Sequence, residues 1–136
     1  MVAKFRFEDT GSNYFGRVLR PVAKVSFNSL DSDSWIEAWM IVDTGADFTI
    51  LPHYLAKELQ ISLESDCIQD KTFGVGGERM IYLCKKKIKA KLGKIEREIP
   101  LGFFDNNEVP ALLGRLGFME TLNTEFTKNH TVIFKE

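Results

Sequence analysis

Short apolar stretches separated by turn residues run along most of the chain, a pattern that predicts strands rather than helices. Residues 16–29 (GRVLRPVAKVSFNS) are rich in Val and Phe, and Pro21 within them favours an edge strand or a bulge. Residues 30–34 (LDSDS) predict a turn. Residues 35–42 (WIEAWMIV) then predict the second strand of the same hairpin. We therefore expect an all-β domain with little helix.

Helical character is confined to short segments. Residues 52–59 (PHYLAKEL) begin with a proline, which suits a first helical turn, and carry two leucines four residues apart on one face. Residues 117–122 (GFMETL) could form one short helix. The C-terminal residues 124–136 could form a last hairpin turning near Asn129, or a single strand.

Residues 67–84 (CIQDKTFGVGGERMIYLC) predict a long hairpin with a glycine-rich turn. If Val75 and Gly76 are the central turn residues, Cys67 faces Cys84 across the strands. A bulge would break this register, so the two thiols can also be neighbours on one face without being directly opposite.

Residues 85–100 (KKKIKAKLGKIEREIP) hold a cluster of lysines that could bind a polyanion. A two-residue turn in this segment places Lys91 opposite Glu96 and Lys89 opposite Glu98, with isoleucines and leucines on the other face. Opposite charges across a strand pair are stabilising. This register favours the solvent-exposed face of a hairpin over a nucleic-acid site.

Composition and charge narrow the classes of protein without changing this picture. The chain has 136 residues, 44% of them apolar, which suits one domain spanning residues 1–136 with a hydrophobic core. A net charge of −1 gives no overall attraction to nucleic acid or to an anionic membrane. No apolar run approaches the roughly 18 residues of a membrane helix, and the N-terminus has no signal-like stretch. We therefore expect a cytoplasmic location and two cysteines that remain thiols.

The segment 39–52 (WMIVDTGADFTILP) places two carboxylates and a glycine between apolar runs. Aspartate is unfavourable in strands and costly beside an apolar core unless it has partners or a task. A plain turn between strands is one explanation, and a catalytic carboxylate is the other. Phosphoryl-transfer motifs do not fit, because Thr44 and Gly45 stand where they need Lys or a second Asp. The two histidines lack metal-ligand spacing, so no metal site is expected.

A pair of aspartates that share a proton could activate water, with one carboxylate as base and the other as acid. Such a site needs an aspartate presented by a tight turn. A threonine after it, here Thr44, can fix the turn through its hydroxyl. A glycine next, here Gly45, lets its N–H approach the carboxylate without a Cβ in the way.

The hexapeptide VDTGAD (residues 42–47) resembles the active-site motif of aspartic proteases, specifically of the single-domain retropepsin-like group. Two more segments resemble that group in the same order. GVGG (residues 74–77) resembles the flap that closes over the substrate, and ALLGR (residues 111–115) resembles the segment that supports the catalytic loop. The resemblance spans about residues 35–118. Bacterial and archaeal relatives of the retroviral enzymes resemble this chain more closely than the retroviral enzymes themselves. It implies a closed β-barrel with one or two short helices.

The resemblance also implies a role for each matching residue. The implied catalytic group is Asp43, Thr44 and Gly45; the implied substrate-binding residues are Ala46, Asp47, Gly74, Val75, Gly76 and Gly77; the implied structural support is Leu112, Leu113, Gly114 and Arg115. Asp47 would form an ion pair with Arg115, although a surface carboxylate is the simpler alternative for Asp47. Removal of one partner of a buried pair costs about 3–5 kcal/mol, so Arg115→Ala should unfold the protein or loosen the site.

The chain contains a single Asp-Thr-Gly, whereas the mechanism needs two aspartates. The inference is a homodimer with twofold symmetry, in which each subunit contributes one Asp43. The expected activity is that of an aspartic endopeptidase without a cofactor. It would cleave extended peptides with hydrophobic residues beside the cut, favoured by mild acid. The alternatives are a non-catalytic peptide-binding or assembly module of the same fold and, less favoured, nucleic-acid binding through residues 85–91.

Overall fold

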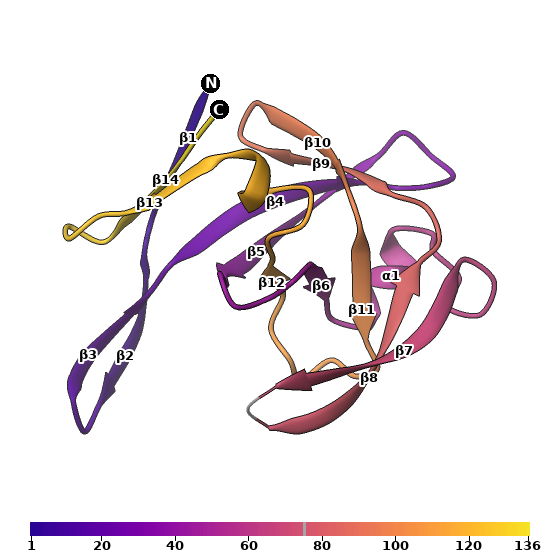
Figure 1. Cartoon of the computed structure of the whole chain (residues 1–136), viewed down its shortest axis with the longest axis horizontal. Coiled ribbons are helices and arrows are strands. Elements are labelled where there is room, and N and C mark those ends of the chain that lie inside the picture. Colours follow the sequence, from indigo (N-terminus) through magenta and orange to yellow (C-terminus); the bar gives the residue numbers. More distant parts are fainter. Residues whose placement is uncertain (75) are drawn as a thin grey trace.

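The computed structural model describes residues 1–74 and 76–136, which form mainly β-strands (Figure 1). The strands are, in chain order, β1 (Val2–Arg6), β2 (Glu8–Asn13), β3 (Gly16–Arg20), β4 (Val22–Asn28), β5 (Trp35–Val42), β6 (Thr49–Leu51), β7 (Cys67–Gly74), β8 (Gly77–Cys84), β9 (Ile88–Leu92), β10 (Ile95–Ile99), β11 (Leu101–Phe104), β12 (Leu112–Leu113), β13 (Asn123–Phe126) and β14 (Thr131–Lys135). The helical elements are α1 (Tyr54–Glu58) and a 3-10 helix, η1 (Met119–Thr121). Both lie within the two predicted helical segments and are shorter than predicted. No helix of the described residues is long and apolar enough to cross a membrane.

The largest sheet has nine strands in the order β10-β9-β4-β5-β12-β6-β11-β8-β7. Its neighbours are antiparallel except for two parallel pairs, β5 with β12 and β6 with β11. The sheet is open, because β10 and β7 lie at its edges and do not pair with each other in the part of the chain that the structure describes. The implied closed barrel is therefore wrong. The strand β7 is exposed along most of its length and extends with β8 as a hairpin instead of returning to β10 (Figure 1).

The core consists of alternate residues of this sheet together with side chains from the segments that cover it. Strand β9 buries every second residue, and β10 buries its two end residues, Ile95 and Ile99, as expected for a sheet with one solvated face. The largest fully buried side chains are Phe27, Phe103, Phe118, Phe134, Met40, Leu51, Leu59, Ile81, Ile88, Leu92, Ile95 and Ile99. This core fixes the strands that carry the candidate site.

The lysine-rich hairpin β9–β10 has the predicted register. Lys91 faces Glu96 and Lys89 faces Glu98. The Lys91 ammonium lies 4.0 Å from the Glu96 carboxylate and 4.1 Å from the ring centroid of Trp35. The prediction that these lysines occupy the solvent-exposed face of a hairpin is confirmed.

The β7–β8 hairpin also has its predicted register, with Cys67 directly opposite Cys84. Both cysteines are free thiols, with their Sγ atoms 3.8 Å apart. Burial raises the pKa of both thiols, most strongly that of Cys84. Both thiols are therefore protonated at neutral pH. They lie at the packed base of a hairpin whose tip is exposed.

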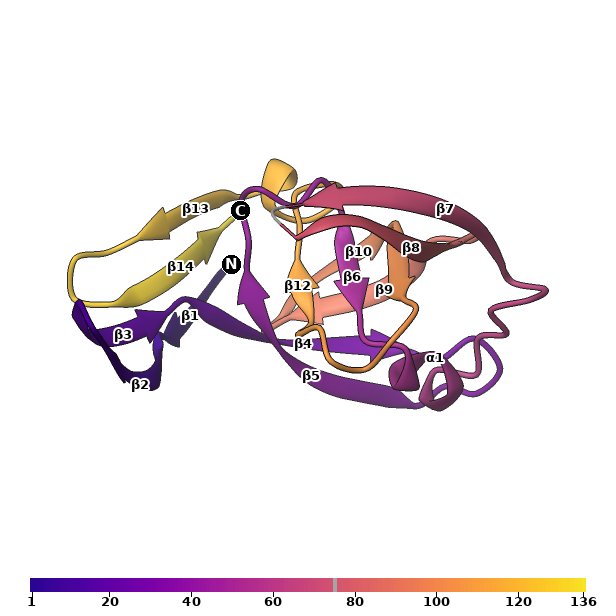
Figure 2. The same ribbon diagram turned by 90° about the horizontal axis from the view of Figure 1, so that it is seen from below.

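Two smaller sheets project from one side of the nine-stranded sheet (Figures 1 and 2). Strands β1, β14 and β13 form one, and β2 with β3 forms the other. The predicted single strand over residues 16–29 is thus two strands in two sheets, because Pro21 has no N–H with which to continue the ladder. At the C-terminus the hairpin alternative is confirmed, with Asn129 in the loop between β13 and β14.

Candidate active site

Asp43 lies directly after β5, in a turn that its own side chain stabilises. The Gly45 N–H donates to Asp43 Oδ1 at 2.9 Å, and the Ala46 N–H donates to the Asp43 carbonyl at 3.1 Å. A Cβ on Gly45 would lie 3.2 Å from the same carboxylate oxygen, so a glycine permits this approach. Asp43 is half-buried, which leaves part of its carboxylate free.

Strand β12 and the residues that follow it run alongside this turn and hold it to the sheet. The Asp43 N–H donates to the Leu113 carbonyl at 3.0 Å, and the Arg115 N–H donates to the Ala46 carbonyl at 3.0 Å. The Gly114 N–H donates to the buried Thr49 hydroxyl at 3.2 Å. These three bonds fix the position of the aspartate relative to β12, β6 and the core below.

Gly114 sits where the two segments come closest. A Cβ at this position would lie 2.3 Å from the carbonyl carbon and oxygen of Phe48, which are backbone atoms that cannot move aside easily. Only glycine fits here without displacing the Asp43 turn. The implied structural role of Gly114 therefore has a direct steric basis.

Asp47 and Arg115 form the implied ion pair, with the Arg115 Nη2 donating to Asp47 Oδ1 at 2.7 Å. The Arg115 Nη1 also donates to the Thr44 carbonyl at 2.5 Å. The side chains are 74% and 44% exposed for Asp47 and Arg115, respectively, so the expectation of a buried pair does not hold for the single chain. Both groups lie at the rim of the loop, where water screens the charges, and the 3–5 kcal/mol cost of a buried pair does not apply.

A cavity of about 410 Å³ lies beside Asp43. The candidate residues that line it are Asp43, Gly45, Ala46, Gly74, Gly76, Gly77 and Leu112. The tip of the β7–β8 hairpin and the Asp43 turn, far apart in sequence, thus line one cavity. Val75 lies outside the described residues. The remaining candidates lie elsewhere: Thr44, Asp47, Leu113, Gly114 and Arg115 are not among the lining residues.

Six further residues line this cavity that sequence reasoning did not single out. They are Ile50, Thr72, Phe73, Arg79, Phe104 and Val109. Thr72 and Arg79 are directly opposite each other in β7 and β8, so the hairpin register could have identified them as one patch. Ile50 and Phe104 belong to strands whose parallel pairing is long-range, and no local signal brings them together.

The cavity is largely apolar, with one anionic and one cationic group. Ile50, Phe104 and Leu112 belong to a small hydrophobic cluster that forms part of its wall. Asp43 supplies a carboxylate and Arg79 a guanidinium. Within the described residues, no three His, Cys, Asp or Glu side chains lie close enough together to hold a metal ion. The arrangement can accept an extended chain with apolar side chains and expose its backbone to a carboxylate.

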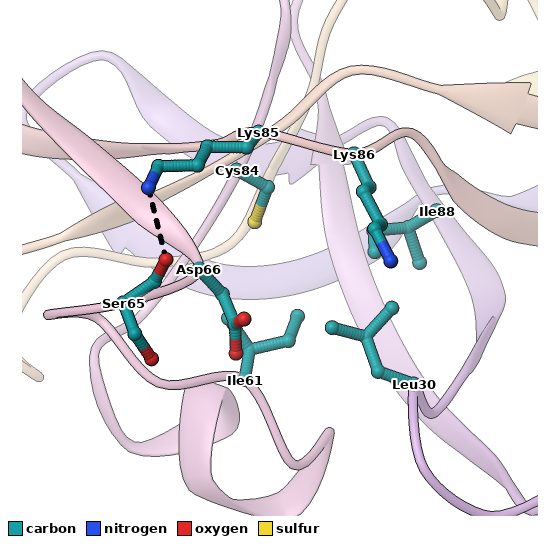
Figure 3. A pocket seen from close by; sticks show the side chains of 8 residues that line it. All are labelled: Leu30, Ile61, Ser65, Asp66, Cys84, Lys85, Lys86 and Ile88. Carbon is teal, nitrogen blue, oxygen red and sulfur yellow. Dashed lines mark hydrogen bonds between the residues drawn. The ribbon is translucent and has the colours of Figure 1, made fainter.

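A second, smaller cavity of about 160 Å³ lies at the base of the β7–β8 hairpin (Figure 3). Cys84 and Ile88 contribute to its wall, and Lys85 at its edge donates to the Ser65 carbonyl at 3.0 Å. None of its lining residues lines the Asp43 cavity. It is a separate feature of the fold.

Comparison with known proteins bears on the same segments. A search of curated proteins found no match. A family model described as aspartyl protease matches residues 23–116, which run from within β4 to beyond β12 and include the Asp43 turn and the β7–β8 hairpin. The match covers well over half of the chain. The chain therefore belongs to the retropepsin-like aspartyl protease family.

Proposed function

We propose that the protein is an aspartic endopeptidase that works as a homodimer, with Asp43 of each subunit in one shared site. The observation that carries this proposal is the cavity in which the Asp43 carboxylate, the apolar wall and the glycine-rich hairpin tip meet. The family match supports the same chemistry. In this proposal the β7–β8 hairpin is the flap, and its tip covers the bound peptide.

The need for a second copy follows from the number of carboxylates. The sequence holds one Asp-Thr-Gly, and Asp43 is the only acidic residue among those that line the cavity in the described part of the chain. Thr44 is exposed beside it and does not face the cavity. A symmetric partner would place a second Asp43 next to the first, with Thr44 of each loop at the contact between subunits.

The proposed reaction uses the two carboxylates in different protonation states. Like charges at close range do not both ionise readily, so one Asp43 is ionised and the other protonated. The ionised carboxylate accepts a proton from a water molecule while the water oxygen attacks the peptide carbonyl carbon. The protonated carboxyl gives its proton to the carbonyl oxygen, which forms a neutral diol.

Collapse of this intermediate completes the cycle. The carboxyl that received the proton from water passes it to the amide nitrogen, and the C–N bond breaks. The other carboxylate takes a proton from one hydroxyl of the diol as the carbonyl reforms. Each Asp43 then has its starting protonation state. The Gly45 N–H holds one oxygen of Asp43 throughout, which leaves the other oxygen for water and substrate.

The proposed substrate is an extended peptide with hydrophobic side chains beside the cleaved bond. Glycines at the hairpin tip and at Gly45 leave backbone groups accessible, so the peptide can add as a strand between them. Ile50, Phe104 and Leu112 offer an apolar surface to its side chains.

The variant Asp43→Asn tests the proposal directly. Its amide oxygen can still accept the Gly45 N–H, so the turn and the fold should persist, whereas the ionisable carboxylate is lost. We expect cleavage of a library of extended peptides, followed by mass spectrometry at mildly acidic pH, to fall by about 10²–10⁴-fold. Thermal unfolding and circular dichroism provide the control for the fold.

Two results would contradict the proposal. Equal turnover by Asp43→Asn would remove the catalytic role of this carboxylate. A dimer that binds a statine peptide but cleaves no peptide, with its two Asp43 groups too far apart to share a water, would instead identify a non-catalytic peptide-binding module. Sedimentation of the wild-type chain with and without the statine peptide measures the required association.

A further inference from the structure

Two aromatic side chains stand almost free of the protein at the tip of the β2–β3 hairpin. Tyr14 is 96% exposed and Phe15 is 92% exposed. Their ring centroids lie 5.5 Å apart in an edge-to-face arrangement. Together they form one apolar surface at the tip of the hairpin. We call this hairpin (residues 8–20) the arm.

The turn that carries this aromatic pair does not need aromatic residues to form. The Asn13 side-chain oxygen accepts the Phe15 N–H at 2.8 Å, and Gly16 adopts a φ of +108°. Asn and Gly favour a turn at its first and last positions, and the two positions between them accept most side chains. The aromatic pair is thus displayed on a preset turn, which lowers the entropy lost when it binds.

The arm contributes nothing to the core. Neither β2 nor β3 contains a buried residue. Its support comes from its own ladder and from an exposed ion pair, in which Arg17 lies 3.3 Å from Asp9. Isolated two-stranded hairpins are marginally stable in water. A projecting hairpin with an aromatic tip is therefore stabilised when a second surface covers it.

The position of the arm indicates what that surface is. In both views the arm and the β1-β14-β13 sheet lie on the same side of the nine-stranded sheet (Figures 1 and 2). Strand β5, which ends at the Asp43 turn, runs toward that side (Figure 1). The chain therefore passes from β5 into the Asp43 turn on the side of the nine-stranded sheet where the arm projects.

We propose that the arm is a dimer clasp, in which Tyr14 and Phe15 of each subunit pack against the surface of the other. This inference rests on the homodimer of the proposed function and adds the element that holds it together. Aromatic side chains bury on the order of 150–250 Å² each, so the four rings of a symmetric pair would remove roughly 600–1,000 Å² from water. Stable interfaces bury about 1,200–2,000 Å² in total. The clasp would supply a large share of that area.

The test is the dimer dissociation constant of the full chain, measured by sedimentation over a range of concentrations. The double variant Tyr14→Ser, Phe15→Ser should raise this constant by at least about 30-fold, because aromatic anchors are typical interface hot spots. Its peptidase activity should fall at low concentration and recover at high concentration. The matched control is Tyr54→Ser, a half-exposed tyrosine on α1, which should leave the constant unchanged.

A crosslinking experiment locates the contact. A photoreactive benzoylphenylalanine replaces Phe15 in a mixture of ¹⁴N-labelled and ¹⁵N-labelled chains. We expect crosslinked peptides that join a light chain to a heavy one. Crosslinks confined to chains of one label would show that the tip contacts its own subunit, and would overturn the clasp.

The outcomes separate this inference from the proposed function. If the double variant dimerises as tightly as the wild type, the clasp is wrong while the dimeric peptidase stands. If the wild-type chain stays monomeric and inactive at every concentration, the proposed function fails first, and the clasp fails with it. If the double variant dimerises normally but loses binding to lipid vesicles that the wild type shows, the arm belongs to a membrane surface and the clasp is overturned.

Discussion

The Asp43 turn and the tip of the arm contain the same local hydrogen bond but differ in their surroundings. At Asp43 a side-chain oxygen accepts the N–H two residues later at 2.9 Å, and at Asn13 the same contact measures 2.8 Å. The first turn is bonded to the neighbouring segment at Leu113 and Arg115, and the second extends into solvent. One presents a carboxylate to a cavity, and the other presents two aromatic rings to solvent.

The comparison shows that the local turn does not define the active site. Asp9 and Asn106 make the same kind of contact, with the N–H groups of Gly11 and Glu108. What distinguishes Asp43 is its surroundings, namely the bonds across to the segment after β12 and the cavity shared with the β7–β8 hairpin. Variants at the two turns and at the β7–β8 hairpin test this difference between a packed turn and a solvent-exposed one.

The variant Gly114→Ala should have the largest effect, because the new methyl would overlap the Phe48 backbone. Overpacking of this kind costs about 1–3 kcal/mol and occasionally more. We expect about 3 kcal/mol of the free energy of unfolding to be lost, measured by urea denaturation. The control is Gly74→Ala at the hairpin tip, where a Cβ meets no atom within 4 Å. Equal losses for the two variants would show that the packed segment does not constrain the turn.

The β7–β8 hairpin contains the same contrast between its exposed tip and its packed base. Burial raises the pKa of the Cys67 and Cys84 thiols above the ordinary value of 9.0. Above pH 9 the unfolded chain therefore loses thiol protons that the folded chain keeps. Stability is fully present below pH 9 and is lost as the pH rises toward the folded-state pKa, by up to about 1.4 kcal/mol per pH unit for each thiol.

Urea denaturation between pH 8 and pH 10 measures this loss (roughly the range in which a free thiol ionises). The combined variant Cys67→Ala, Cys84→Ala provides the reference, because it differs from the wild type only in the two thiols. The wild-type curve should fall more steeply with pH than the variant curve. Parallel curves would mean that the thiols are as accessible in the folded chain as in the unfolded one.

The variant Arg115→Ala should have a smaller effect on stability than its central position suggests. It removes the bonds to Asp47 and to the Thr44 carbonyl, yet these groups lie at an exposed rim. We expect a loss of about 1 kcal/mol or less in the free energy of unfolding. Peptide cleavage should fall further, by up to about 100-fold, because the loop that carries Asp43 is less well positioned.

Arg115→Lys is the matched control, since it keeps the charge without the fork of donors that reaches two acceptors. It should unfold like the wild type and cleave at an intermediate rate. A loss near 3–5 kcal/mol for Arg115→Ala in the monomer would show instead that the pair behaves as a buried one.

Local pairing could be predicted from the sequence, because a two-residue turn and a period of two fix the register. The β9–β10 and β7–β8 hairpins follow the predicted pairs, including Cys67 with Cys84 and Lys91 with Glu96. The Asp43 turn was predicted from its aspartate and glycine, and its pairing with the segment at Arg115 from the resemblance. Each of these rests on neighbouring residues or on an ordered motif.

The long-range features could not be predicted in the same way. Whether the sheet closes depends on pairing between its two edge strands, β10 and β7, which are far apart in sequence. These two strands do not pair in the described residues, and β7 is exposed along most of its length. The cavity wall at Ile50 and Phe104 depends on the parallel pair β6–β11. The exposure of the Asp47–Arg115 pair depends on which segments cover the loop. Each requires the tertiary arrangement that a local pattern does not contain.

The variant Asn13→Ala should have the smallest effect on global stability, and it tests the free turn most directly. It removes the oxygen that accepts the Phe15 N–H, but water can replace that partner at an exposed site. Because β2 and β3 bury no residue, the free energy of unfolding should change by less than about 0.5 kcal/mol. The dimer dissociation constant should nevertheless rise, since the aromatic tip is no longer held in a preset turn. A loss of stability above 1 kcal/mol in the monomer would mean that the arm unfolds together with the core, and the contrast between the two turns would then be one of degree.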